Sequence, residues 1–213
     1  MAAHKSEILL NKQVQEFDVK NIALTSRDGE EKLAELATLE EADIIVNVLS
    51  GTAGIKATKA ALSKGKTVLL GNKETLVAEG AEIMRLAKKD QLFSIDSEHN
   101  AIFEILKKHP KKTVKKIILP CSGGPFLNKS KEELAKVTVE DALAHPKWNM
   151  GAKISIESAT LLNKGLEIIE AHYLFGFVLE QIKVVIHPEC LVHGIVEFKD
   201  AQIAYISPPD MKE

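Results

Sequence analysis

The alternation of short apolar runs with amphipathic stretches over residues 43–96 constrains the fold of this chain most strongly. The run from Asp43 to Leu49 is almost wholly apolar, which is typical of a strand buried on both faces of a parallel sheet. Strands that alternate with helices across short connections form βαβ units with right-handed crossovers. The sequence therefore predicts a doubly wound α/β sheet, with helices at 55–63 and 74–89 and further strands at 67–70 and 92–95.

The two ends of the chain follow other patterns. Near the N-terminus, Ser6 is expected to cap a helix whose apolar residues face a core, namely Ile8, Leu9, Val14 and Phe17. Beyond residue 96 the regular alternation stops, which predicts an α+β region. Its expected elements are strands at 114–119, 182–186, 194–198 and 202–206, short helices at 131–136 and 139–144, and one helix at 158–172.

Composition excludes several classes of protein. The chain has 213 residues, 45% of them hydrophobic and 27% charged, as expected for a globular protein of one or two domains. A net charge of -2 gives no case for a general nucleic-acid surface, although residues 107–116 are locally basic. The two cysteines favour a reducing compartment, and no apolar run could span a bilayer. We therefore expect a cytoplasmic protein without nucleic-acid or membrane partners.

A polar cluster follows the last predicted strand of the first region. If that strand persists, Asp96 and Glu98 lie on one face, because residues two apart in a strand share a face. Their carboxylates could hold Mg²⁺ or Mn²⁺, since hard cations prefer oxygen ligands. The alternative is that Asp96 or Ser97 simply caps a helix over residues 98–108.

Three polar segments fall at the carboxyl ends of neighbouring predicted strands, where open α/β sheets bind their ligands. They are residues 50–54, 71–74 and 96–98. Glycine and asparagine in such turns often serve backbone geometry alone. Lys73 and Glu74 could likewise be a solvated lysine and a capping charge. Three such segments at one edge nevertheless favour a crevice.

Two loops of the second region carry candidate ligand-binding groups. Residues 121–126 combine small residues with Ser122, so they could form an anion-binding loop or an ordinary glycine turn. Residues 145–151 contain the only tryptophan, Trp148, in a loop bounded by proline and glycine. A tryptophan in such a loop is either a packing anchor or the tip of a lid that closes over a ligand.

The helix predicted for residues 158–172 carries a polar stripe. Asn163 and Glu167 are four residues apart and therefore share a face of this helix. Ser158, at its expected start, could hold a phosphate together with Lys164 and the free N–H groups of the first turn. Glu167 could complete a three-carboxylate cation site. The alternative is the polar stripe of an amphipathic surface helix.

These segments, taken in order, closely resemble the 1-deoxy-D-xylulose 5-phosphate reductoisomerase family. The matching motifs are residues 71–74, 95–103, 122–126, 145–151 and 163–167, followed by 186–188 with His193 and by Pro209-Asp210-Met211. The resemblance covers nearly the whole chain in uninterrupted motifs, so it is highly specific.

The resemblance implies an enzyme of the methylerythritol phosphate route to isoprenoids. Such an enzyme rearranges 1-deoxy-D-xylulose 5-phosphate and reduces the resulting aldehyde with NADPH to 2-C-methyl-D-erythritol 4-phosphate, using Mn²⁺ or Mg²⁺. By motif match, Asp96, Glu98 and Glu167 are the metal ligands, and the catalytic residues are Lys73, Glu98, His145 and Glu167. The same match assigns substrate contacts to Lys73, Ser97, Glu98, Ser122, His145, Trp148, Ser158, Asn163, Lys164 and Glu167. It assigns cofactor contacts to Lys5, Ser6, Asn72, Glu74 and Gly151.

Two parts of the family pattern are not found in this sequence. Family members begin with a strand and a G-x-T-G-x-I-G turn that cradles the cofactor pyrophosphate, and they end with a helical domain. We therefore expect residues 1–96 to form a partial NADPH-binding, Rossmann-like domain that binds NADPH poorly, and residues 97–213 to form the metal- and substrate-binding domain. The family resemblance implies a homodimer. Two other interpretations stay open: an inactive fragment that retains a ligand or partner site, and a metal-dependent sugar-phosphate isomerase or lyase that uses no nicotinamide.

Overall fold

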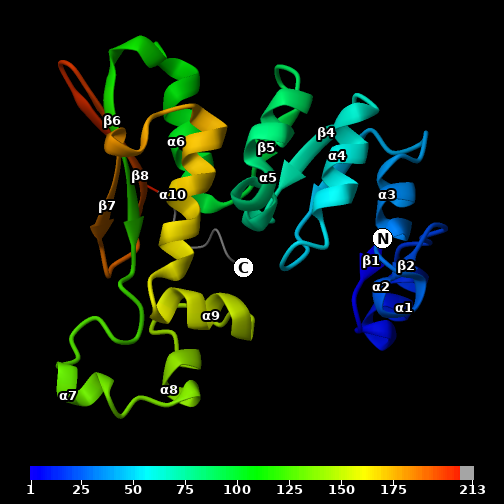
Figure 1. The fold of residues 1–213 in the computed structure, drawn as a ribbon, viewed down its shortest axis with the longest axis horizontal. Coiled ribbons are helices and arrows are strands. Elements are labelled where there is room, and N and C mark those ends of the chain that lie inside the picture. Colours follow the sequence, from blue (N-terminus) through cyan, green and yellow to red (C-terminus); the bar gives the residue numbers. More distant parts are fainter. Residues whose placement is uncertain (207–213) are drawn as a thin grey trace. The chain divides into compact units, whose positions relative to one another are not determined.

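The computed structural model describes residues 1–206 and divides after Asp96 into two compact units (Figure 1). The first unit spans Met1–Asp96, and the second begins at Ser97. Both units combine helices with parallel strand pairs, so the α/β class predicted from the sequence is confirmed. Residues 209–211, which match the family motif, lie outside the described residues. Among the described helices, none has the length and apolar character needed to cross a membrane.

The first unit contains two parallel sheets, ordered β1-β2 and β3-β4-β5. Its elements are β1 Ala2–Ala3, α1 Glu7–Glu16, β2 Ala23–Leu24, α2 Thr25–Asp28, α3 Glu31–Ala37, β3 Ile44–Asn47, α4 Ile55–Ser63, β4 Thr67–Leu70, α5 Lys73–Leu86 and β5 Leu92–Ser94. The alternation over residues 43–96 thus produces the expected strands and helices, whereas the described strands form two separate ladders and not one continuous sheet.

Strand β3 lies at the edge of its sheet, and the prediction that both its faces are buried is wrong. Ile44 and Val46 are each 57% exposed, whereas Val68 and Leu70 of the central strand β4 are fully buried. The buried side of β3 carries Asn47, whose amide donates to the Gly54 carbonyl at 3.1 Å and to Thr58 Oγ1 at 2.8 Å. The apolar run therefore predicted the strand correctly but did not predict that one of its faces is exposed.

Helix α1 also differs from the expectation. Ser6 precedes the helix without a side-chain cap, and Ile8 and Phe17 are 89% and 62% exposed. The one buried residue of α1 is Leu10. The periodicity was compatible with two faces, and the face that contacts the rest of the first unit is the less apolar one.

The second unit is built on a mixed four-stranded sheet of order β7-β6-β8-β9. Strand β6 pairs in parallel with β7 and antiparallel with β8, and β9 pairs antiparallel with β8. The elements are α6 Ser97–Lys108, η1 Lys111–Thr113, β6 Val114–Cys121, α7 Lys131–Leu134, α8 Val139–Leu143, α9 Ala152–Ala159, α10 Leu162–Phe175, η2 Leu179–Gln181, β7 Ile182–Ile186, β8 Val192–Phe198 and β9 Gln202–Ile206.

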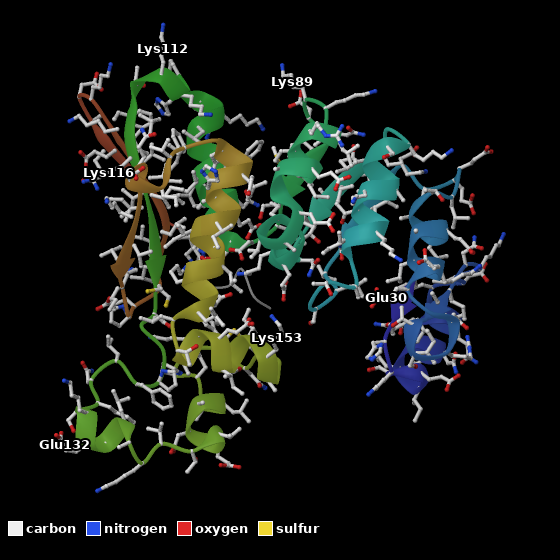
Figure 2. All side chains as sticks on the ribbon, viewed as in Figure 1. Glu30, Lys89, Lys112, Lys116, Glu132 and Lys153 are labelled. Carbon is white, nitrogen blue, oxygen red and sulfur yellow. The ribbon has the colours of Figure 1, made fainter. Side chains whose placement is uncertain are left out.

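Helices α6 and α10 pack on this sheet through one buried cluster. Ile102 and Ile105 of α6 and Ala171 of α10 meet Ile117 and Leu119 of β6 in it. Full burial of one such aliphatic side chain contributes about 1.5–3 kcal/mol. The packing fixes the two helices against a common surface. The basic segment 107–116 connects α6 to β6 at the rim of the unit, and its residue Lys112 points into solvent (Figure 2).

Two boundaries in this unit correct the sequence interpretation. Helix α6 begins at Ser97, so Glu98 lies in a helical first turn and the strand spacing proposed for Asp96 and Glu98 does not hold. The single helix expected at 158–172 is two helices, because Leu161 adopts a left-handed conformation with φ 60° between them. Ser158 consequently lies near the end of α9 and not at a helix start, which removes the N-terminal phosphate geometry proposed for it.

Two short helices follow β6 and are held mainly by their own caps. In α7, the Ser130 hydroxyl accepts from the Glu133 amide while the Glu133 carboxylate accepts from the Ser130 amide. Thr138 and Asp141 form the same reciprocal pair at α8. Helix α7 buries none of its residues, and α8 buries only Ala142.

Candidate active site

Two carboxylates converge where α6 and α10 face each other. Glu98 comes from the first turn of α6 and Glu167 from the second turn of α10. One oxygen of each lies within 4.8 Å of the other. Lys164 stands between them, its Nζ 2.9 Å from Glu98 Oε1 and 2.5 Å from Glu167 Oε2. Glu167 is 1% exposed and Lys164 5% exposed, so this charge cluster is largely withdrawn from water.

The two carboxylates keep Lys164 charged. Burial alone lowers the pKa of Lys164, but the negative charges and hydrogen bonds of Glu167 and Glu98 outweigh it and hold this pKa above the ordinary value. Glu167 receives a further hydrogen bond at Oε1 from Asn163 Nδ2, at 2.6 Å. The shared face predicted for Asn163 and Glu167 is therefore observed. Both oxygens of Glu167 have donors in the second unit.

The donor set suits a hard divalent cation. Carboxylate oxygens are the preferred ligands of Mg²⁺ and Mn²⁺. Asn163 Oδ1, beside Glu167, is buried and accepts no hydrogen bond from the described residues. A buried carbonyl oxygen of this kind normally has a partner, so a ligand that donates or coordinates there would satisfy it. Ser97 Oγ donates to Glu98 Oε2 at 2.6 Å and orients that carboxylate.

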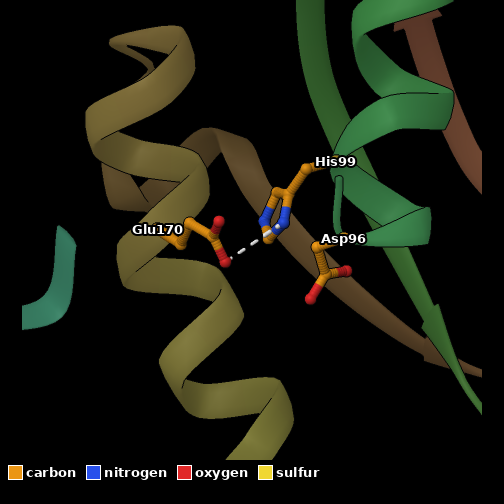
Figure 3. Close-up of side chains that lie close together, drawn as sticks. All are labelled: Asp96, His99 and Glu170. Carbon is orange, nitrogen blue, oxygen red and sulfur yellow. Dashed lines mark ion pairs between the residues drawn. The ribbon is translucent and has the colours of Figure 1, made fainter. Parts of the chain in front are cut away.

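A histidine and a glutamate lie directly behind these carboxylates, and neither was predicted from the sequence as a site residue. His99 follows Glu98 on α6, and Glu170 follows Glu167 by about one turn on α10. The two side chains point toward each other (Figure 3), with His99 Nδ1 3.3 Å from Glu170 Oε2. Both are fully buried. The i,i+3 spacing from Glu167 was the available signal, since it puts Glu170 near the same face.

Asp96, also drawn in Figure 3, is the last residue of the first unit. Within that unit its Oδ2 accepts from Lys73 Nζ at 2.7 Å, and the two side chains are only 12% and 9% exposed. Lys73 is the first residue of α5, immediately after the turn that ends β4. The predicted neighbours Lys73 and Asp96 are thus brought together at the carboxyl ends of β4 and β5.

Asn72 and Glu74 hold the turn that follows β3. Asn72 Nδ2 donates to the carbonyls of Leu49 and Gly51, both at 2.7 Å, and to Glu74 Oε2 at 2.9 Å. Glu74 Oε1 accepts from the Gly51 amide at 3.2 Å. Asn72 is 1% exposed, so its side chain stabilises this turn from the buried side. Lys5 lies exposed just before α1.

The loop after β6 brings Ser122 to His145. The two backbone amides of Lys147 and Trp148 donate to His145 Nδ1 at 3.2 and 3.1 Å. Because Nδ1 accepts, the proton of the neutral ring lies on Nε2, which donates to Ser122 Oγ at 3.1 Å. Ser122 Oγ also accepts from the Gly124 amide at 3.1 Å. Trp148 is partly buried in this arrangement.

Glycine at position 124 lets this loop approach α9. Gly124 has φ 70°, and a Cβ there would lie 2.8 Å from the Ser158 carbonyl oxygen. The close contact brings the loop of Ser122 next to Ser158, the second-last residue of α9. Gly151, the N-cap of α9, is exposed. Beside Ser122, burial raises the pKa of the Cys121 thiol, so this cysteine stays protonated at neutral pH.

Comparison with known proteins places the chain beside one group of enzymes. The family model described as "1-deoxy-D-xylulose 5-phosphate reductoisomerase" matches residues 1–80, and the model of the C-terminal domain of the same enzyme matches residues 92–175. A reductoisomerase of this name from Bacillus subtilis is 51% identical over 187 residues, which is 86% of this chain and 49% of the relative. Another from Halothermothrix orenii is 43% identical and matches 100% of this chain and 60% of its own length.

Solved structures of similar proteins include complexes with ligands. A DOX-P reductoisomerase in complex with NADPH, fosmidomycin and magnesium is 40% identical, with a TM-score of 0.84 over 99% of this chain and 54% of its own. The reductoisomerase from Zymomonas mobilis in complex with NADPH is 40% identical, with a TM-score of 0.80 over the same shares. The chain thus spans about half the length of most of the relatives it matches.

Proposed function

The chain belongs to the 1-deoxy-D-xylulose 5-phosphate reductoisomerase family, and from this premise we propose that it converts 1-deoxy-D-xylulose 5-phosphate to 2-C-methyl-D-erythritol 4-phosphate with NADPH. The observation that carries the proposal is the convergence of Glu98 and Glu167 on Lys164. Glu167 is buried and Glu98 part-buried, and together they offer oxygen ligands to a divalent cation beside the Lys164 ammonium. A rearrangement that develops negative charge on substrate oxygens is stabilised by a cation held at such carboxylates.

We infer that Asp96, Glu98 and Glu167 hold the divalent cation. Asp96 precedes Glu98 by two residues, so the chain itself keeps their Cα atoms within about 7 Å. A similar reductoisomerase has been solved with magnesium. The cation, when bound, acts as a Lewis acid that stabilises charge on the substrate oxygens. Asn163 and Ser97 orient the carboxylates through the hydrogen bonds they donate to Glu167 and Glu98.

The remaining second-unit residues are proposed to bind and enclose the sugar phosphate. Lys164 supplies a positive charge that is kept by its surroundings, which suits a phosphate or a substrate hydroxyl. The Ser122 hydroxyl accepts from His145 Nε2 and from the Gly124 amide, and its own proton is proposed to go to a substrate oxygen. Trp148, in the same loop, is proposed to cover the bound substrate and exclude water. Ser97 and Ser158 complete the proposed substrate contacts, together with Lys73 of the first unit.

Residues 1–96 are proposed to bind NADPH, and residues 97–213 the metal and the substrate. Asn72 and Glu74 would contribute by holding the turn at Gly51 in shape, as their hydrogen bonds indicate. Lys5, Ser6 and Gly151 are proposed as further cofactor contacts, with Lys5 suited to the 2′-phosphate of NADPH. We also propose that the protein acts in the cytoplasm as a homodimer, in line with the family resemblance.

The test is NADPH consumption by the purified chain with Mn²⁺ and 1-deoxy-D-xylulose 5-phosphate. Glu167→Gln is expected to abolish the signal, because it removes a negative ligand while keeping the side-chain shape. Glu180→Gln, at an exposed position of the same unit, is the matched control and should retain wild-type activity. Full activity of Glu167→Gln would refute the metal assignment. Product formation without NADPH would instead favour an isomerase or lyase that uses no nicotinamide.

A further inference from the structure

A buried link joins the helix of one proposed metal ligand to the backbone of another. His99 and Glu170 are fully buried, and the function proposed above uses neither. His99 Nε2 lies 3.0 Å from the main-chain oxygen of Glu167, and His99 Nδ1 lies 3.3 Å from Glu170 Oε2 (Figure 3). The imidazole therefore reaches from α6 to two points on α10.

The direction of one of these contacts is fixed by chemistry. A carbonyl oxygen only accepts, so His99 Nε2 donates to the Glu167 carbonyl. The ring can make this bond only in one orientation, which puts Nδ1 3.3 Å from Glu170 Oε2, and a proton carried by either group would make this contact attractive. The centroid of the Phe175 ring lies 6.2 Å from that of the His99 ring, and His99 itself is fully buried. In this dry surrounding, polar contacts are stronger than in water.

The link lies directly beside the two proposed metal carboxylates. Glu98 precedes His99 directly, and Glu167 carries the carbonyl that His99 holds. One oxygen of each carboxylate lies within 4.8 Å of the other, and Lys164 Nζ between them offsets their repulsion through side chains alone. The bond from His99 to the backbone of Glu167 adds a link between α6 and α10 that does not depend on Lys164. Groups that orient metal ligands in this way commonly control metal affinity.

We propose that Glu170 is a positioning residue for the cation site, which acts by orienting His99 and so sets the spacing of Glu98 and Glu167. The inference rests on the proposed function, since it needs a cation at those two carboxylates. The new claim is that cation affinity depends on the length of the Glu170 side chain, which brings its carboxylate to His99, and that Glu170 does not coordinate the cation. Glu170 thus determines how tightly the cation is held.

The experiment measures the Mn²⁺ dissociation constant by titration calorimetry on the full chain, together with the melting temperature of each variant. Glu170→Gln keeps the reach to His99 and should stay within about 3-fold of the wild-type affinity. Glu170→Asp keeps the charge but shortens the side chain, and should weaken Mn²⁺ binding by about 10–100-fold. If Glu170 were itself a ligand, this order would reverse, because Asp can still coordinate and Gln coordinates poorly.

Two further arms decide the remaining outcomes. In a His99→Asn background, Glu170→Asp should cause little additional loss, because its effect passes through His99. Glu180→Asp is the control and should change nothing. A lower melting temperature with unchanged Mn²⁺ affinity in Glu170→Asp would overturn the proposal in favour of a purely structural pair. If the wild-type chain and Glu167→Gln bind Mn²⁺ equally, the proposed metal site is refuted, and with it the proposed function. If Glu167→Gln loses binding but Glu170→Asp does not, the metal site stands and only the role of Glu170 is refuted.

Discussion

Replacing Lys164 by methionine removes a buried positive charge while keeping most of the side-chain length. The change leaves Glu98 and Glu167 facing each other without the ammonium group that now lies 2.9 and 2.5 Å from their oxygens. Removing one partner of a buried ion pair costs about 3–5 kcal/mol, because the remaining charge stays desolvated. For a chain of this size, 1 kcal/mol corresponds to about 2–4 °C in melting temperature, so we expect a loss of about 6–20 °C.

The pH dependence has a defined sign. The pKa of Lys164 is raised in the folded protein, so its stabilising contribution is complete below the unfolded value of about 10.4 and is lost as the pH rises toward the folded value. The difference between wild type and Lys164→Met should therefore stay constant near neutral pH and shrink only above about pH 10.4. Added Mn²⁺ should stabilise the variant more than the wild type, because the cation replaces the lost positive charge at the two carboxylates.

The assay is thermal and urea unfolding followed by circular dichroism, with Lys153→Met as the matched control. Lys153 pairs with Glu157 at 2.6 Å on the surface of α9 (Figure 2), and its side chain is 46% exposed. Glu157 is 15% exposed, but because Lys153 itself lies largely in water the pair is expected to contribute only about 1 kcal/mol. If Lys164→Met costs no more than this control, the buried bridge between Glu98 and Glu167 does not stabilise the chain and the reasoning is refuted.

Four other substitutions have expected effects that follow from the structure. In urea unfolding, Gly124→Ala should destabilise the protein by about 1–3 kcal/mol, because the new Cβ would lie 2.8 Å from the Ser158 carbonyl oxygen. Gly165→Ala is the control and should stabilise by about 0.5–1 kcal/mol, because the space around it is open. Equal effects of the two changes would contradict the close approach at Gly124. Leu161→Gly should raise stability by up to about 1 kcal/mol, since it relieves a left-handed leucine at φ 60°, and a clear loss would show that its packing matters more. Hydrogen bonds from Arg27, the larger effect, and from the Leu24 amide lower the pKa of Asp28 to about 2. The ionised Asp28 therefore stabilises the folded protein above about pH 3.9, and this contribution is lost as the pH falls through 2. In melting curves over that range, Asp28→Asn should therefore lose less stability on acidification than the wild type.

The sequence predicted those features that depend on local patterns. The strand at 67–70 and the helix at 55–63 have the predicted bounds, because hydrophobic periodicity and turn residues are local signals. The contact of Asn163 with Glu167 also followed from helical spacing. The motif residues of the candidate site could be named for the same reason, since each motif is a short continuous segment.

The missed features depend on packing between distant segments. Whether Ile44 is covered depends on which strand lies beside β3, and an apolar run carries no information about that neighbour. The helix break at Leu161 could not be predicted, because no glycine or proline marks it and leucine rarely adopts a positive φ. The contact of His99 with Glu170 joins two helices of the second unit and could be recognised only once their packing was known.

The reciprocal caps of α7 and α8 make the segment between β6 and α9 largely independent of the core. Its helical turns are stabilised by Ser130 with Glu133 and by Thr138 with Asp141, and almost none of its side chains is buried. Local opening of such a segment sacrifices little apolar burial, so its amide hydrogens should exchange with solvent far faster than those of β6. The segment that carries His145 and Trp148 is therefore expected to open more readily than β6, while its two short helices keep the hydrogen bonds of their own caps.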